Sequence, residues 1–190
     1  MSSHDLTVAP RPVGAKVIPL QPYRKVQSFD SHYETGRQLR EQGRIEEAIR
    51  EWQRAAVLDR GSLEVRLDLG VALAETGQLE QAAYYFKNAL ELDPSNSEAH
   101  YYLGLAYFQM DDMEKAARVW TAAVRLDPED WELRLSLTEA FMELGKYQKA
   151  LRQLERILEV QPNHLDALNL RGVLYLHTGE LDLAKAELED

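Results

Sequence analysis

Residues 97–130 read SEAHYYLGLAYFQMDDMEKAARVWTAAVRLDPED, and the order of apolar and polar residues in this segment indicates the fold. Within 97–109 the apolar residues recur at the spacing of one helix face. After a polar break, a second stripe of the same kind begins at Met113. Pro128 disfavours helical backbone at the residue before it and so ends the second stripe. The stretch therefore predicts two helices joined by a short turn.

The same pattern recurs along the chain with a period of 34 residues, without insertion or deletion. We divide the chain into units 29–62, 63–96, 97–130 and 131–164, followed by an incomplete unit 165–190. Small residues return in register, with glycine at 36, 70, 104 and 172 and alanine at 48, 82, 116, 150 and 184. Large residues recur at unit position 24, namely Trp52, Phe86, Trp120, Leu154 and Leu188. Small residues let helix axes approach closely while the large ones fill the space between them.

This pattern resembles the tetratricopeptide repeat family. The family signature is a small residue at unit position 8, alanine at 20, a large residue at 24, a small residue at 27 and proline at 32. The departures are Thr138 at position 8, Ile157 at position 27 and Arg60 at position 32. The resemblance covers residues 29–190 and implies an all-α fold. That fold is a right-handed α-solenoid of helix-turn-helix repeats, with a concave groove lined by the first helix of each unit.

In this family, positions 2, 5, 9 and 12 of each first helix line the groove. At positions 5, 9 and 12 of units two to five, ten of the twelve residues are apolar, which is not the pattern of a solvated face. The predicted peptide-binding residues are Leu67, Val71, Glu98, Tyr101, Leu105, Phe108, Leu135, Glu139, Met142 and Val173. An alternative for Leu67, Leu135 and Val173 is ordinary packing against neighbouring first helices. An alternative for the acidic residue at position 2 of each unit, Glu98 included, is that the helix dipole alone explains it.

The lining predicts the chemistry of the partner. Apolar residues beside carboxylates suit a hydrophobic or basic-amphipathic peptide segment, either helical or extended. Chaperone-binding members of the family hold acidic tails with cations, but only Arg37 is cationic at the corresponding positions here. We therefore expect a scaffold or adaptor for protein–protein interaction. Two alternatives stay open: an N-terminal interaction module of a larger enzyme, such as a glycosyltransferase or signalling enzyme, and a homo-oligomeric assembly protein.

Residues 1–28 break the repeat. They hold four of the seven prolines, and they carry four basic residues but one acid. One interpretation is a flexible, proline-rich basic tail. The other is that VGAKVIPLQPYRKV (13–26) docks into the groove of its own chain or of a neighbour. At the other end the sequence stops inside the second helix of unit five, so we expect either a fragment of a longer protein or self-association through this open end.

Composition excludes several classes of function. The formal net charge is −10, which disfavours nucleic-acid binding by charge neutralisation. No apolar run is long enough to cross a bilayer, and residues 1–13 do not form a secretory signal. The chain has no cysteine, which fits a cytoplasmic location. We find no catalytic, phosphate-binding or metal-binding motif, so we expect no enzyme activity, no cofactor and no metal.

Overall fold

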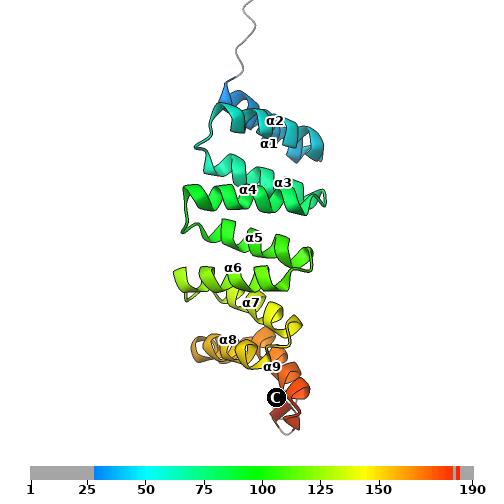
Figure 1. Cartoon of the computed structure of the whole chain (residues 1–190), viewed down its shortest axis with the longest axis vertical. Coiled ribbons are helices and arrows are strands. Elements are labelled where there is room, and N and C mark those ends of the chain that lie inside the picture. Colours follow the sequence, from blue (N-terminus) through cyan, green and yellow to red (C-terminus); the bar gives the residue numbers. More distant parts are fainter. Residues whose placement is uncertain (1–27, 182, 185–190) are drawn as a thin grey trace, which may run out of the picture.

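The computed structural model describes residues 28–181 together with 183 and 184. Within these residues the chain forms α-helices and no strand: α1 (Phe29–Glu41), α2 (Ile45–Leu58), α3 (Leu63–Glu75), α4 (Leu79–Leu92), α5 (Ser97–Gln109), α6 (Met113–Leu126), α7 (Trp131–Glu143), α8 (Tyr147–Val160) and α9 (Leu165–Thr178). Successive helices pair as hairpins, and α9 opens a fifth unit. Figure 1 shows the helices following one another along the long axis of the molecule. The predicted all-α solenoid of helical hairpins is confirmed.

The first helix of every unit begins at a capping side chain. The side chain at unit position 34 accepts a hydrogen bond from the backbone N–H three residues later, and the caps are Ser28, Ser62, Asn96, Asp130 and His164. These bonds satisfy N–H groups that have no partner inside the helix. The polar residue before each apolar stripe therefore sets where the first helix starts.

The turn inside each hairpin depends on one residue in the left-handed region. Gly43, Gly77 and Gly145 have φ values between 65° and 77°, and Asp111 takes the same place with φ 60°. Glycine adopts this conformation without a steric penalty, and aspartate is among the residues that tolerate it best. The third hairpin therefore keeps the common turn although its glycine is missing.

The core of each hairpin pairs a small residue with a large one. Gly36, Gly70 and Gly104 lie directly against the rings of Trp52, Phe86 and Trp120, and a Cβ at any of these glycines would overlap the ring. The fourth hairpin has Thr138 and Leu154 at the same two positions, and both are fully buried. The close approach of first and second helix thus explains the glycine series.

The main packing between helices joins neighbours in the sequence, and α3 also contacts α5. This arrangement brings the first helices of units two and three side by side. Unit positions 5, 9 and 12 lie on one face of each first helix, because they are spaced by about one helical turn. The packing therefore assembles one surface from several first helices.

Candidate functional site

The candidate site is an apolar strip on the first helices of units two to four. It consists of Leu67 and Val71 on α3, Tyr101, Leu105 and Phe108 on α5, and Leu135 and Met142 on α7. All seven side chains pack against the core on one side and remain partly exposed on the other. None is sealed between helices, so the strip is an accessible apolar surface.

The other three predicted residues are more exposed than the strip. Glu98 and Glu139 are exposed on α5 and α7, and Val173 is 37% exposed on α9. Leu176 lies one helical turn from Val173 and is 50% exposed. Among the described residues, unit positions 9 and 12 on α9 are thus open to solvent, which gives no support to ordinary packing as the reason for Val173.

The first unit carries a polar network at the positions where the next units carry the strip. Tyr33 donates a hydrogen bond to Asp68 on α3, with 2.8 Å between Oη and Oδ2. Arg40 pairs with Glu75 on α3, with 2.5 Å between Nη2 and Oε1. Burial first, and then the bond to Asp68, raises the pKa of Tyr33 to about 12. The polar groups at this end are therefore satisfied by their own chain.

The third unit presents aromatic side chains and carboxylates around a hollow of about 160 Å³ between α5 and the start of α7. The hollow is lined by Ser97, Glu98, Tyr101, Tyr102, Asp130 and Glu132. The ring of Tyr102 stacks on Phe86, with 5.5 Å between centroids, and meets Tyr101 edge-on at 5.4 Å. Burial, followed by the charge of Glu98, raises the pKa of the Tyr102 hydroxyl. A cation entering this hollow would meet both carboxylates and aromatic rings.

The core beneath the strip holds its central residues in place. The indole Nε1 of Trp120 donates to the backbone oxygen of Tyr101 at 3.2 Å. The same indole ring lies 5.9 Å, centroid to centroid, from the ring of Phe108. Trp52 makes the equivalent bond to the backbone oxygen of Tyr33 at 3.1 Å. Trp120 thus positions Tyr101 and Phe108, the two ends of the α5 part of the strip.

Carboxylates on α7 border the strip. Burial, followed by the nearby charge of Glu143, raises the pKa of Glu139, although the side chain keeps contact with solvent. Within the described part of the chain, Glu98, Glu132, Glu139 and Glu143 have no Lys or Arg nitrogen within 4.0 Å. Among the described residues, this border therefore carries negative charge with no close positive partner.

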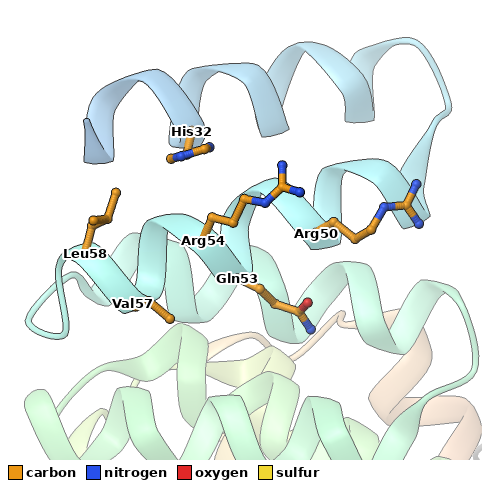
Figure 2. A pocket seen from close by; sticks show the side chains of 6 residues that line it. All are labelled: His32, Arg50, Gln53, Arg54, Val57 and Leu58. Carbon is orange, nitrogen blue, oxygen red and sulfur yellow. The ribbon is translucent and has the colours of Figure 1, made fainter. Parts of the chain in front are cut away.

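A separate pocket of about 570 Å³ lies on the first hairpin. Figure 2 shows His32 on α1 and Leu58 and Arg54 on α2 pointing toward the space between the two helices. Glu51 is 2.5 Å from His32 Nδ1 and also pairs with Arg54. Glu51 thus partners both His32 and Arg54, and no feature of the sequence predicted this pocket.

Residues 28–181, 183 and 184 hold neither a metal-binding cluster nor a membrane-spanning helix. No group of three or more His, Asp or Glu side chains there is arranged to hold a metal ion. No helix among the same residues is long and apolar enough to cross a bilayer. The segment 13–26, predicted as a possible ligand of the groove, lies outside the described residues.

Comparisons with known proteins identify the repeats. Family profiles described as TPR repeat or tetratricopeptide repeat match residues 36–77, 70–111, 97–130 and 135–190. A crystal structure of MamA has a TM-score of 0.79 at 24% identity, covering 85% of this chain and 88% of that chain. YrrB, described as a TPR protein with an unusual peptide-binding site, has a TM-score of 0.73 at 22% identity, covering 86% and 84%. A search of curated proteins found no match.

Proposed function

The chain belongs to the tetratricopeptide repeat family, and from this premise we propose that it is a scaffold that binds a peptide segment of a partner protein along the apolar strip. The observation that carries the proposal is that the side chains of the strip are partly exposed. Its seven side chains rest on a rigid core but keep apolar area in water, and covering that area is favourable by about 25 cal/mol per Å². The peptide-binding site of YrrB, which has the same fold, supports this choice.

The border of the strip favours a ligand that carries Lys or Arg beside apolar residues. Glu139 and Glu143 repel each other, and this repulsion contributes to the raised pKa of Glu139. A ligand cation between them would relieve the repulsion. Glu98 and Glu132 offer a second acidic position at the hollow on α5. A basic-amphipathic segment would therefore match both the apolar strip and its border.

The proposed scaffold has no catalytic role of its own, and we place it in the cytoplasm. The described residues are helical repeats from α1 to α9, with loops too short to carry an additional domain. The lack of cysteine suits a reducing compartment. These two parts of the proposal depend on the family and the composition rather than on the strip.

A random peptide library displayed on phage and selected against the full chain tests the binding proposal. We expect the enriched peptides to combine aromatic or aliphatic residues with Lys or Arg. One enriched peptide, labelled with fluorescein, then serves in anisotropy titrations. Enrichment of acidic peptides, or the absence of any shared pattern, would contradict the proposed ligand.

The matched variants compare the same chemical change on the two faces of the molecule. Glu98→Lys with Glu132→Lys should weaken binding of the selected peptide about tenfold, which is about 1.4 kcal/mol. Glu46→Lys with Glu80→Lys is the control, because these glutamates also lie in the first turn of a helix, on α2 and α4. Both pairs change the net charge equally. Equal loss of binding in both would show that the charge of the whole protein, not the border of the strip, attracts the peptide.

A further inference from the structure

The second helices of units three and four form a basic cleft that has no role in the proposed function. It has a volume of about 620 Å³ and runs between α6 and α8. Five cations line it, and one carboxylate, Glu114, does so as well. The cations are Arg118 and Arg125 on α6, Lys146 at the start of α8, and Lys149 and Arg152 on α8. In a chain of net charge −10, this concentration of positive charge stands out.

The charges of the cleft have no close counter-charge among the described residues. Among the described residues, no carboxylate oxygen lies within 4.0 Å of any of the five cations. Arg152 Nε donates to the backbone oxygen of Gln148, which leaves its charge unpaired. Lys149 Nζ lies 5.7 Å from the ring centroid of Phe141, which is buried at the floor of the cleft. All five cationic side chains are exposed and available to a ligand.

The preceding unit shows that this charge is not a general property of the repeat. Between α4 and α6, Lys115 is the counterpart of Lys149, and it pairs with Asp112. Lys146 stands one repeat later at the position of that aspartate, and Arg125 stands at the position of Glu91. The same register thus carries balanced charges in one place and mostly positive charges in the next.

We propose that the basic cleft binds an extended, Asp- and Glu-rich segment of a partner protein. Lys146 and Arg125 occupy unit positions 16 and 29, which separates them by about 20 Å along the helices. This length corresponds to about six residues of extended peptide. The spacing fits a row of carboxylates better than a single phosphate group, which would engage cations that converge on one point. The floor formed by Phe141 and Ala117 offers apolar contact to the stems of the acidic side chains.

The rest of the molecule favours a peptide over a nucleic acid. A nucleic-acid strand continues its charge beyond the cleft and would run onto an acidic surface, where it is repelled. An acidic peptide segment can end where the cations end. The cleft lies on second helices, whereas the apolar strip lies on first helices, so the two surfaces can be occupied by different partners.

The test is a titration of the full chain with a fluorescein-labelled peptide whose six central residues alternate Asp and Glu, at about 50 mM salt to limit screening. A peptide with Asn and Gln in their place is the neutral probe. We expect saturable binding of the acidic peptide, no binding of the neutral one, and amide chemical-shift changes confined to α6, the end of α7 and α8. Failure of the acidic peptide to bind, or shift changes at the apolar strip instead, would overturn the proposal.

Variants separate the cleft from the overall charge. Lys146→Glu with Lys149→Glu should weaken binding of the acidic peptide at least tenfold, whereas Lys87→Glu with Arg156→Glu, which alters the net charge equally, should change it less than twofold. Equal effects of the two pairs would refute a specific cleft. A short oligo-dT strand that binds more tightly than the peptide, and loses binding in the first pair, would show a nucleic-acid site instead. Inorganic phosphate that competes at millimolar concentration would show a single-anion site.

Discussion

The third and fourth hairpins solve the same packing problem with opposite choices of side chain. In the third, Gly104 leaves room for the indole of Trp120, which fills the space between α5 and α6. In the fourth, Thr138 takes the position of the glycine and Leu154 that of the tryptophan. The Thr138 hydroxyl donates to the backbone oxygen of Arg134 at 2.8 Å, so the polar group is satisfied. The repeat therefore conserves the filled volume between the two helices rather than particular residues.

This difference extends to the surface. Trp120 bonds to the backbone of Tyr101 and packs near Phe108, so an aromatic core residue supports an aromatic surface. Leu154 has neither an N–H donor nor a ring, and the surface above it carries Leu135, Glu139 and Met142. Variants that change one hairpin toward the other test this contrast.

Gly104→Ala should destabilise the protein by about 3 kcal/mol, because the new methyl group overlaps the Trp120 ring and disturbs its bond to Tyr101. Thr138→Ala at the equivalent position should cost about 1 kcal/mol or less. Urea unfolding followed by circular dichroism measures both. Small and equal decreases in the free energy of unfolding would mean that the ring of Trp120 can move aside.

Leu154→Trp alone should destabilise the fourth hairpin by about 2 kcal/mol, because Thr138 occupies the space that an indole needs. Adding Thr138→Gly should recover at least half of that loss, since it recreates the pairing of the third hairpin. A double-mutant cycle of unfolding free energies gives the coupling directly. Additive losses would show that the two positions do not share one volume.

Leu105→Ala with Phe108→Ala should weaken binding of the selected basic-amphipathic peptide about tenfold, which is about 1.4 kcal/mol. The circular dichroism spectrum should keep its helical signal. Leu135→Ala with Met142→Ala makes a comparable truncation on α7 and should have a smaller effect, because the aromatic part of the strip is intact. Anisotropy titrations compare the pairs. Loss of helical signal in the first pair would identify these residues as core instead of binding surface.

Asp111→Gly should stabilise the protein by about 0.5 kcal/mol, because glycine adopts the positive φ of this turn without the steric cost that a side chain brings. Gly145→Asp makes the reverse change in the fourth hairpin and should destabilise it by a similar amount. The shift in thermal midpoint measures both. Effects of the same sign in both variants would exclude backbone conformation as the cause.

Glu139→Gln should stabilise the protein at pH 7 by less than about 0.5 kcal/mol. The folded protein raises the pKa of this carboxyl, so ionisation disfavours the folded state above that pKa. The advantage of the variant should therefore disappear as the pH falls below the ordinary pKa of glutamate, where both side chains are neutral. Free energies of unfolding measured from pH 3.5 to 7.5 test this. A stability advantage of the variant that grows toward low pH would contradict the prediction.

The sequence predicts the helices and their register because each unit repeats the same local requirements. The sequence directly shows the small residue at position 8, the large residue at position 24 and the proline at position 32. It also shows the residue that caps the next helix. The positions of the apolar strip follow from the same register. Their role in binding stays a proposal, and the experiments above address it.

The basic cleft was not predictable by the same reasoning. Arg125 and Lys146 are 21 residues apart in the sequence, and each alone is an ordinary surface cation. Only the placement of α6 beside α8 brings them to one hollow. The bond from Trp120 to the Tyr101 backbone is likewise invisible in the pattern, since Phe86 satisfies the same position without a donor. Properties that depend on which side chains the packed helices bring together need the three-dimensional structure.

Among the described residues the main packing joins helices that are neighbours in the sequence, and none of it ties one end of the array to the other. Cooperativity in such a molecule passes only from each hairpin to the next, and the terminal hairpins open without first breaking the middle. Amide hydrogens of α5 and α6 should then exchange with deuterium more slowly than those of α1 and α9. A ligand that spans several hairpins would slow the exchange of all of them together, because none of these hairpins could open without losing contacts to the ligand.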